Sequence, residues 1–211
     1  MRKAMTGREL VRFAREKLGT AYVYGMKGAV MTAANFNYLY SRYGSPAVPY
    51  SDHKKVGRVC VDCSGLISWA CGKALGSDGW RAAADVVQPI ETLGDAPIGA
   101  LVWRKGHIGI YTGRKNGVLH YIAADGSAYG VREVPVSKNN FTHWLLVHSV
   151  FAYEEDEEMA EQDTVLVDGK KHEVMLIRKD GVTYIKSRDI AALLGYEISS
   201  EGRMPVFTKK G

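Results

Sequence analysis

The sequence predicts an α+β fold in which N-terminal helices precede an antiparallel sheet, followed by a small C-terminal α+β module. Three observations lead to this prediction. Apolar residues near the N-terminus recur at helical spacing. Short strand-like segments follow one another between about residues 99 and 150, separated by glycine-containing turns. The acidic run EEDEE at 154–158 then separates this region from a segment with its own strand and turn signals.

The first predicted helix lies in the N-terminal 19 residues. Leu10, Ala14 and Leu18 share one face, Thr6 is a suitable N-cap, and Gly19 is suited to end the helix. The stretch from about 20 to 58 is rich in Gly, Tyr and Ser and is predicted to be mainly loop.

A second helix is predicted over 64–75, starting at or just after Cys63. The segments downstream read as strands because apolar residues alternate or cluster over short lengths between turns. They are GALVW (99–103), HIGIY (107–111), VLHYI (118–122), GVREVPV (130–136) and WLLVHSV (144–150).

Three regions follow from composition. Residues 1–150 hold 19 basic and 10 acidic residues, 151–163 hold seven acids and no base, and 164–211 hold nine bases and six acids. We therefore expect a domain, an acidic linker and a small module. In the module, Asp168-Gly169 and Asp180-Gly181 predict turns between strands, and a short helix should follow Ser187 and end at Gly195.

The overall composition limits the function classes. The 211 residues include 46% hydrophobic and 24% charged residues, as expected of a globular protein, and the net charge is +5. A basic surface attracts polyanions such as nucleic acid, an anionic cell wall or a membrane surface. No basic run or nucleic-acid motif favours nucleic acid, and no apolar run of about 18 residues predicts membrane insertion. The N-terminus lacks the apolar core of a secretory signal, which predicts synthesis in the cytoplasm without a signal peptide.

Three cysteines, Cys60, Cys63 and Cys71, lie in the stretch CVDCSGLISWACG. A zinc site would need a fourth ligand such as His53, and no second ligand pair follows. A redox Cys-x-x-Cys pair would need a βαβ context, which the flanking sequence lacks. All three could instead be small buried hydrophobes, a reading that suits Cys71 and Cys60 better than Cys63.

Cys63 is the candidate nucleophile because it stands at the predicted start of a helix. Unpaired backbone N–H groups and the positive end of the helix dipole favour a thiolate there, and the same N–H groups could hold an oxyanion. Such a nucleophile requires a histidine base. His107 opens the strand HIGIY, where Gly109 on the same face would leave open space beside the imidazole. His120 on the next strand is either a half-buried strand residue or the group that orients His107.

These residues resemble a known family. DCSGLISW, HIGIYTG and VLHYIA, in that order, are similar to the motifs of the NlpC-type cell-wall cysteine peptidases, papain-like enzymes that cut peptidoglycan stem peptides. LVRFAREKLGTAYVYG resembles their first helix and the tyrosine-containing turn after it, and APIGALVWRKGHIGIY resembles the strand pair that carries the histidine. The resemblance covers roughly residues 6–150.

The resemblance implies a role for six residues. Cys63 would be the nucleophile, His107 the base and His120 the residue that orients it. Asp62 and Ser64 would help bind the free amino end of the stem peptide, and Tyr22, also a substrate-binding residue, would sit beside the thiol. It implies hydrolysis of the D-glutamyl–diamino acid bond through a thioester, with no metal or organic cofactor. The departures from the family pattern are Ala21 in place of proline, Tyr24 in place of tryptophan, the long segment 26–59, and one extra residue between the two histidines.

Two other functions remain open: a Cys/His N-acetylmuramoyl-L-alanine amidase and a non-catalytic cell-wall-binding protein. The module at 164–211 resembles, more weakly, C-terminal modules of phage lysins and wall hydrolases. It would bind the wall, pair two chains into a homodimer or only stabilise the enzyme domain. Without a signal peptide, release in the manner of a phage lysin is expected.

Overall fold

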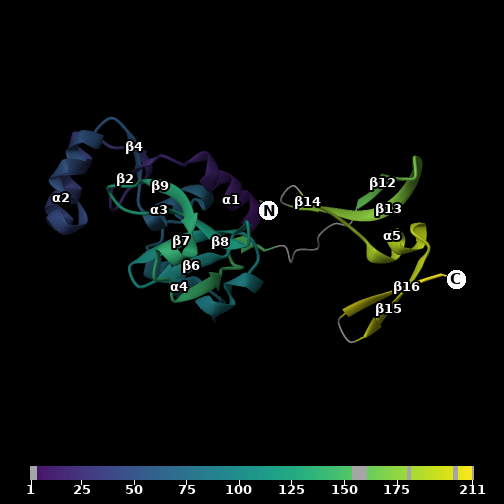
Figure 1. Cartoon of the computed structure of the whole chain (residues 1–211). Helices are drawn as coiled ribbons and strands as arrows, with labels where there is room; N and C mark the ends of the chain where they lie inside the picture. Colours follow the sequence, from purple (N-terminus) through teal and green to yellow (C-terminus); the bar gives the residue numbers. More distant parts are fainter. Residues whose placement is uncertain (1–3, 154–160, 180–181, 202–203, 211) are drawn as a thin grey trace. The chain divides into compact units, whose positions relative to one another are not determined.

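The computed structural model describes residues 4–153, 161–179, 182–201 and 204–210. The chain divides into an N-terminal unit, Met1–Glu155, and a C-terminal unit, Asp156–Gly211. Each unit combines helices with sheets made largely of antiparallel strand pairs, so the predicted α+β class is confirmed (Figure 1). Within the described ranges, no helix combines the length and the apolar character needed to cross a bilayer.

The N-terminal unit is built around a six-stranded sheet in the order β5-β10-β6-β7-β8-β9. Every neighbouring pair in this sheet is antiparallel. The strands are β5 (Val86–Pro89), β6 (Leu101–Arg104), β7 (His107–Lys115), β8 (Val118–Ala124), β9 (Val131–Pro135) and β10 (His143–Leu146). The five strands predicted between 99 and 150 correspond to β6–β10, whereas β5 was missed because its four residues carry no distinct alternation.

Two helices cover one face of this sheet, α1 (Gly7–Glu16) and α3 (Cys63–Cys71) (Figure 1). Thr6 and Glu9 form a capping box, in which each side chain accepts a hydrogen bond from the other residue's backbone N–H, and this fixes the start of α1. Leu10 and Leu66 of the helices pack with Ile108 and Ile110 of β7 in the core between the layers. This arrangement sets the start of α3 beside the start of β7.

The opposite face of the sheet buries a second, aromatic core. Tyr111 and Tyr121 from β7 and β8 pack there with Trp144 of β10 and Phe141 from the loop before it. The alternation predicted for HIGIY is therefore confirmed, because Ile108 and Ile110 face the helices while Tyr111 faces the aromatic core. His107 lies on the aromatic side, where its ring stacks on Phe141 at 5.7 Å between centroids.

The prediction that residues 20–58 form mainly loops was wrong. The segment contains β2 (Ala21–Tyr22), β3 (Lys27–Val30), α2 (Ala33–Ala47) and the 3₁₀ helix η1 (Tyr50–Lys55), and it leads into β4 (Val59–Val61). The helix α2 escapes a search for apolar periodicity because only Phe36 and Leu39 are buried, whereas its tyrosines are exposed. The left-handed backbone of Gly44 interrupts it before Pro46.

A buried ion pair holds η1 against the rest of the N-terminal unit. Lys55 Nζ lies 2.7 Å from Asp52 Oδ1, and both side chains are almost completely buried. Lys55 Nζ also donates to the carbonyl oxygen of Tyr22 at 2.6 Å and to the Oγ of Ser127 at 2.8 Å. Ser127 Oγ in turn donates to Asp52. This cluster connects the insert, the name we give to the long segment 26–59, to Tyr22 of β2 and to Ser127 in the loop after β8.

Replacing Lys55 by methionine is expected to destabilise the protein by about 3–5 kcal/mol, because it leaves the Asp52 carboxylate buried without its counter-ion. Chemical denaturation of the variant and the wild type measures the difference. Lys54→Met is the matched control, since Lys54 is exposed and its replacement should change stability by no more than about 0.5 kcal/mol. Equal losses of unfolding free energy in the two variants would show that the buried ion pair stabilises the protein no more than an exposed lysine does.

Several further elements complete the N-terminal unit. The short helix α4 (Ser77–Ala83) buries Trp80, and η2 (Ile90–Asp95) and η3 (Val136–Lys138) are single 3₁₀ segments. The strand β1 (Met5–Thr6) pairs in parallel with β11 (Phe151–Ala152). Residues 151–152 therefore belong to the folded N-terminal unit, although we expected them in the acidic linker. Residues 154–160 of that linker lie outside the described residues.

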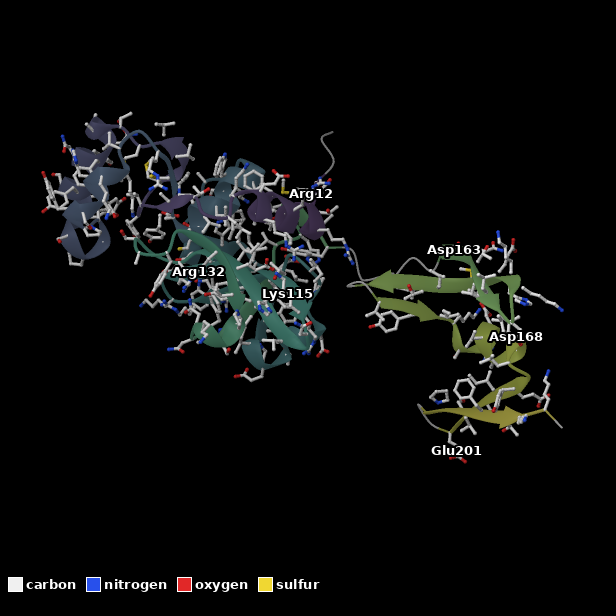
Figure 2. All side chains as sticks on the ribbon, turned by 45° about the horizontal axis from the view of Figure 1, so that its top comes forward. Arg12, Lys115, Arg132, Asp163, Asp168 and Glu201 are labelled. Atoms are coloured by element: carbon white, nitrogen blue, oxygen red, sulfur yellow. The ribbon has the colours of Figure 1, made fainter. Side chains whose placement is uncertain are left out.

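The C-terminal unit contains a three-stranded antiparallel sheet, a helix and a hairpin. These are β12 (Glu161–Val167), β13 (Lys170–Lys179), β14 (Val182–Ile185), α5 (Ser187–Leu193), β15 (Tyr196–Glu201) and β16 (Met204–Lys209). The turn predicted at Asp168-Gly169 is present with both residues at positive φ (Figure 2 labels Asp168), and Gly195 follows the helix as expected. The turn predicted at 180–181 lies outside the described residues. The buried centre of the C-terminal unit is formed by Val174, Leu176 and Ala191.

Candidate active site

Cys63 is the first residue of α3, as the sequence predicts, and follows β4 after a single residue. That residue, Asp62, is the N-cap: its Oδ1 accepts from the Gly65 N–H at 2.5 Å and from the Ser64 hydroxyl at 3.0 Å. Its Oδ2 accepts from the Gly25 N–H at 2.8 Å. Gly65 is required because a Cβ there would lie 2.2 Å from the Met26 carbonyl oxygen. The motif DCSG is thus explained locally by a cap and a close backbone approach.

Cys63 as a residue is only 8% exposed, and its thiol is surrounded by groups with opposing effects on its pKa. Burial raises the pKa to about 11, and the Asp62 carboxylate contributes to the rise. The backbone N–H groups of Ile108, Ser64 and Cys63 act in the opposite direction. The expectation that the helix start favours a thiolate was therefore wrong in its net result, because burial and Asp62 outweigh the backbone N–H groups. The resting group is a thiol, which needs a base to remove its proton.

Replacing Asp62 by asparagine is expected to lower the pKa of Cys63, because it removes a negative charge and retains an oxygen that can cap Gly65. Since pH 8 lies well below a pKa of about 11, the thiolate fraction and the rate of alkylation by iodoacetamide should both rise severalfold. Mass spectrometry of the alkylated peptides at a series of pH values measures the rate at Cys63. Asp78→Asn, at an exposed acid, should leave that rate unchanged. A slower reaction in Asp62→Asn would contradict the assigned effect of the carboxylate.

His107 begins β7, directly before Ile108, whose backbone N–H lies within hydrogen-bonding reach of the Cys63 sulfur. The imidazole Nε2 lies 3.0 Å from Asp125 Oδ1, and both side chains are buried. An ionised carboxylate can only accept, so Nε2 carries the proton and Nδ1 of the neutral ring has the lone pair. Among the described residues, no hydrogen-bond partner is found for Nδ1, so its lone pair is available to accept a proton.

Asp125 is the residue that orients His107, and the sequence analysis did not identify it. Its Oδ2 accepts from the Tyr121 hydroxyl at 2.8 Å and from Arg132 Nε at 2.7 Å. Burial acts to raise the pKa of Asp125, but hydrogen bonds from His107, Arg132 and Tyr121 outweigh it and hold the pKa below its ordinary value. The carboxylate thus stays ionised and fixes the imidazole tautomer.

The structure does not bring His120 to His107, so its predicted role as the orienting residue was wrong. His120 pairs with Gly113 in the hairpin, and its Nδ1 contacts the carbonyl oxygen of Val118 at 2.9 Å. The turn lies at Asn116-Gly117, both with positive φ, which offsets the two histidines along the strands. A β-bulge between Tyr111 and Gly113 then shifts the register, so that continuing the pairing of Ile110 with Ile122 places Asp125 opposite His107.

Gly109 does not leave open space beside the histidine, contrary to the expectation. A Cβ at this position would lie 2.7 Å from the Tyr121 ring. The glycine is needed because that ring occupies the face and carries its hydroxyl to Asp125. The signal that could have identified Asp125 is its position directly after the apolar strand VLHYIAA, at the end of the hairpin that begins with His107.

Tyr22 lies near both Cys63 and Asp62. Burial raises its pKa above the ordinary value, and electrostatic interactions with Cys63 and Asp62 add to the rise. Ser64 is buried and donates to Asp62. Tyr22 also borders a cleft of about 260 Å³ together with His107, Asp125, Arg104 and Arg132. The structure thus gathers Tyr22, Asp62, Ser64, Cys63 and His107 in one region and leaves His120 outside it.

The three cysteines occupy different environments. Cys60 is buried with Met31 and Phe36 in the core of the insert, and Cys71 is the last residue of α3. All three are free thiols. Across the described ranges, no group of three or more His, Cys, Asp or Glu side chains is arranged to hold a metal ion.

No protein-family model matches the chain, and no curated protein matches its sequence. Among solved structures, it is similar to the peptidoglycan hydrolase RipB from Mycobacterium tuberculosis, with 24% identity, coverage of 66% of this chain and 62% of that chain, and a TM-score of 0.44. It is also similar to the NlpC/p60 domain of the peptidoglycan hydrolase SagA, with 19% identity, coverage of 67% and 99%, and a TM-score of 0.42. A third is the P60 domain of an antigen from M. avium subspecies paratuberculosis, with 24% identity, coverage of 66% and 94%, and a TM-score of 0.43. The chain thus spans less than two thirds of the RipB chain.

Proposed function

We propose that the N-terminal unit is a cysteine peptidase of the NlpC type that hydrolyses peptidoglycan stem peptides. One observation carries the proposal. Cys63 begins α3 with its sulfur beside the Ile108 backbone N–H, and the adjacent residue, His107, is held by Asp125 at 3.0 Å with Nδ1 available as a base. A thiol, an oriented imidazole and unpaired N–H groups at a helix start are the components of thiol-dependent acyl transfer.

The proposed reaction begins when His107 Nδ1 takes the proton of Cys63 and the sulfur attacks the amide carbonyl carbon. Backbone N–H groups at the start of α3 stabilise the oxyanion that forms. His107 then gives the proton to the leaving nitrogen, the C–N bond breaks and a thioester remains. Water, deprotonated by His107, attacks the thioester and releases the acyl product with regeneration of the thiol. Because burial keeps Cys63 protonated at rest, each turnover depends on this transfer to His107.

The acyl side of the substrate is proposed to lie against Tyr22, Asp62 and Ser64. Asp62 places a negative charge near both Cys63 and Tyr22, a polarity suited to a free ammonium group. Its oxygens also accept bonds from Gly25, Ser64 and Gly65, so the carboxylate is fixed before a ligand arrives. This supports a stem peptide with a free amino end, and the bond cut would be the D-glutamyl–diamino acid bond.

Digestion of defined muropeptides by the full chain, followed by mass spectrometry, tests the proposal. A new amino terminus on the diamino acid supports the endopeptidase. A new free L-alanine amino terminus on peptides that still carried the sugar would instead identify the Cys/His amidase. Wall binding without any new terminus, and without inhibition by thiol alkylation, would identify a non-catalytic wall-binding protein.

The C-terminal unit is proposed to bind the wall or to pair two chains. Leu166, Tyr184, Leu194 and Phe207 are exposed in this unit, which leaves apolar surface for either role. Pelleting of the full chain with purified walls and sedimentation of the chain alone distinguish the two. If the chain neither pellets with walls nor associates with itself, only a stabilising role is left for this unit. Action at the wall after release in the manner of a phage lysin remains part of this proposal.

A further inference from the structure

A cleft lined by Tyr22, His107 and Asp125 also carries two arginines that the reaction described above does not use. The cleft has a volume of about 260 Å³, and Arg104, Arg132 and Asn139 line it with His107 and Asp125. Arg104 ends β6, and Arg132 lies on β9, where Figure 2 labels it. Strands from both sides of the β7–β8 hairpin therefore contribute a guanidinium to the cleft that contains the base.

Both arginines are held by the hydrogen bonds that also orient His107. Arg132 Nε donates to Asp125 Oδ2 at 2.7 Å, and its guanidinium lies over the Tyr129 ring at 4.0 Å. Arg104 Nε donates to Asn139 Oδ1 at 2.9 Å, and Asn139 Nδ2 contacts the Tyr121 hydroxyl at 3.4 Å. Tyr121 donates to Asp125, which completes the network. The two guanidinium groups are thus positioned before any ligand binds.

Donor groups of both guanidiniums remain unused within this network. Arg104 Nη1 donates to the Lys105 carbonyl oxygen at 3.3 Å. For Nη2 of Arg104 and both Nη atoms of Arg132, the described part of the chain provides no hydrogen-bond acceptor. Asp125 is the acidic side chain of the cleft lining, and its two oxygens already accept from His107, Tyr121 and Arg132. The cleft therefore has an excess of positive charge and spare N–H donors, which suits a carboxylate.

We propose that Arg104 and Arg132 form a subsite for a carboxylate on the leaving part of the substrate. The inference rests on the proposed function: the leaving nitrogen takes its proton from His107, and His107 also lines this cleft, so the residue that carries that nitrogen can reach the two arginines. That residue offers a carboxylate from one of two sources. One is its own α-carboxylate, when it ends the peptide, and the other is a side-chain carboxylate, as in diaminopimelate.

Four synthetic stem tripeptides test the subsite with the full chain. Their last residue is diaminopimelate or lysine, which lacks the side-chain carboxylate, and each is prepared as the free C-terminal acid or as the carboxamide. We expect removal of the recognised carboxylate to lower kcat/KM of the wild type by about tenfold or more, the loss typical of a charge-assisted hydrogen bond. The substrate pair that shows this loss identifies which carboxylate is bound.

The measured quantity is the ratio of kcat/KM with the recognised carboxylate to kcat/KM without it. Arg104→Gln should reduce this ratio toward one, because the variant loses the partner of the recognised carboxylate. Arg104→Lys retains the charge without the planar fork and should keep part of the ratio. Lys105→Gln removes the same charge from the neighbouring exposed residue and should keep the whole ratio. Melting temperatures check that each variant is folded.

The outcomes separate the subsite from the proposed function. Equal cleavage of all four peptides by the wild type would overturn the subsite and leave the peptidase intact. So would a ratio that persists in Arg104→Gln, or one that Lys105→Gln lowers equally, because general attraction of anions would then explain it. If the wild type cleaves none of the four, the proposed function fails and the subsite fails with it.

Discussion

Replacing Cys63 by alanine is expected to lower kcat for stem-peptide hydrolysis by about 10⁶-fold, the loss typical of removing an enzyme's nucleophile. The reason is that, in the proposed reaction, the side chain at this position supplies the atom that forms the thioester. The substitution removes a single sulfur atom from the start of α3, so the fold should persist. Release of the new amino terminus, followed by mass spectrometry, measures the activity, and circular dichroism with a thermal melt measures the fold.

Two other cysteines provide matched controls for this loss. Cys71→Ala changes a partly buried thiol at the end of the same helix. Cys60→Ala changes a fully buried thiol in the core of the insert. Both variants should keep kcat near the wild-type value, although Cys60→Ala should lower the melting temperature because it leaves a small cavity. A comparable loss of activity in all three folded variants would contradict the assignment of Cys63 as the nucleophile.

Replacing Asp125 by alanine is expected to lower kcat/KM by about 10²–10⁴-fold, the range associated with acid–base catalysis by a well-positioned group. Without this carboxylate, His107 loses the acceptor that holds the proton on Nε2 and so leaves Nδ1 available for the proposed proton transfer from Cys63. His120→Ala is the matched histidine variant: its side chain contacts the Val118 carbonyl, and its loss should change kcat/KM by no more than about twofold.

Asp125→Asn separates orientation from stability. The amide oxygen can still accept from His107 Nε2, whereas the amide nitrogen cannot accept from Arg132. This variant should therefore retain more activity than Asp125→Ala. Thermal melts show how much of each loss is unfolding, since Asp125→Ala also deprives Tyr121 and Arg132 of their shared acceptor. Equal losses in His120→Ala and Asp125→Ala would contradict the placement of the orienting residue.

Local sequence patterns predicted much of the fold because the interactions that form those elements lie within a few residues. The capping box of Thr6 and Glu9 starts the first helix, and Asp62 caps the one that carries Cys63. The alternation in HIGIY correctly placed Ile108 and His107 on opposite faces of the sheet. By contrast, α2 went unrecognised because it buries only Phe36 and Leu39, too few residues for a periodic signal.

The sequence by itself determined the α+β class, the position of Cys63 at a helix start and the strand that begins with His107, because each depends on short-range capping and periodicity. Only the tertiary structure decided that Asp125, rather than His120, holds the imidazole. A bulge of one residue in the hairpin changes which residues face each other across the strands, and no local pattern reveals it. The protonation of Cys63 was likewise decided by tertiary packing, because burial beneath distant strands opposes the electrostatic effect of its own helix.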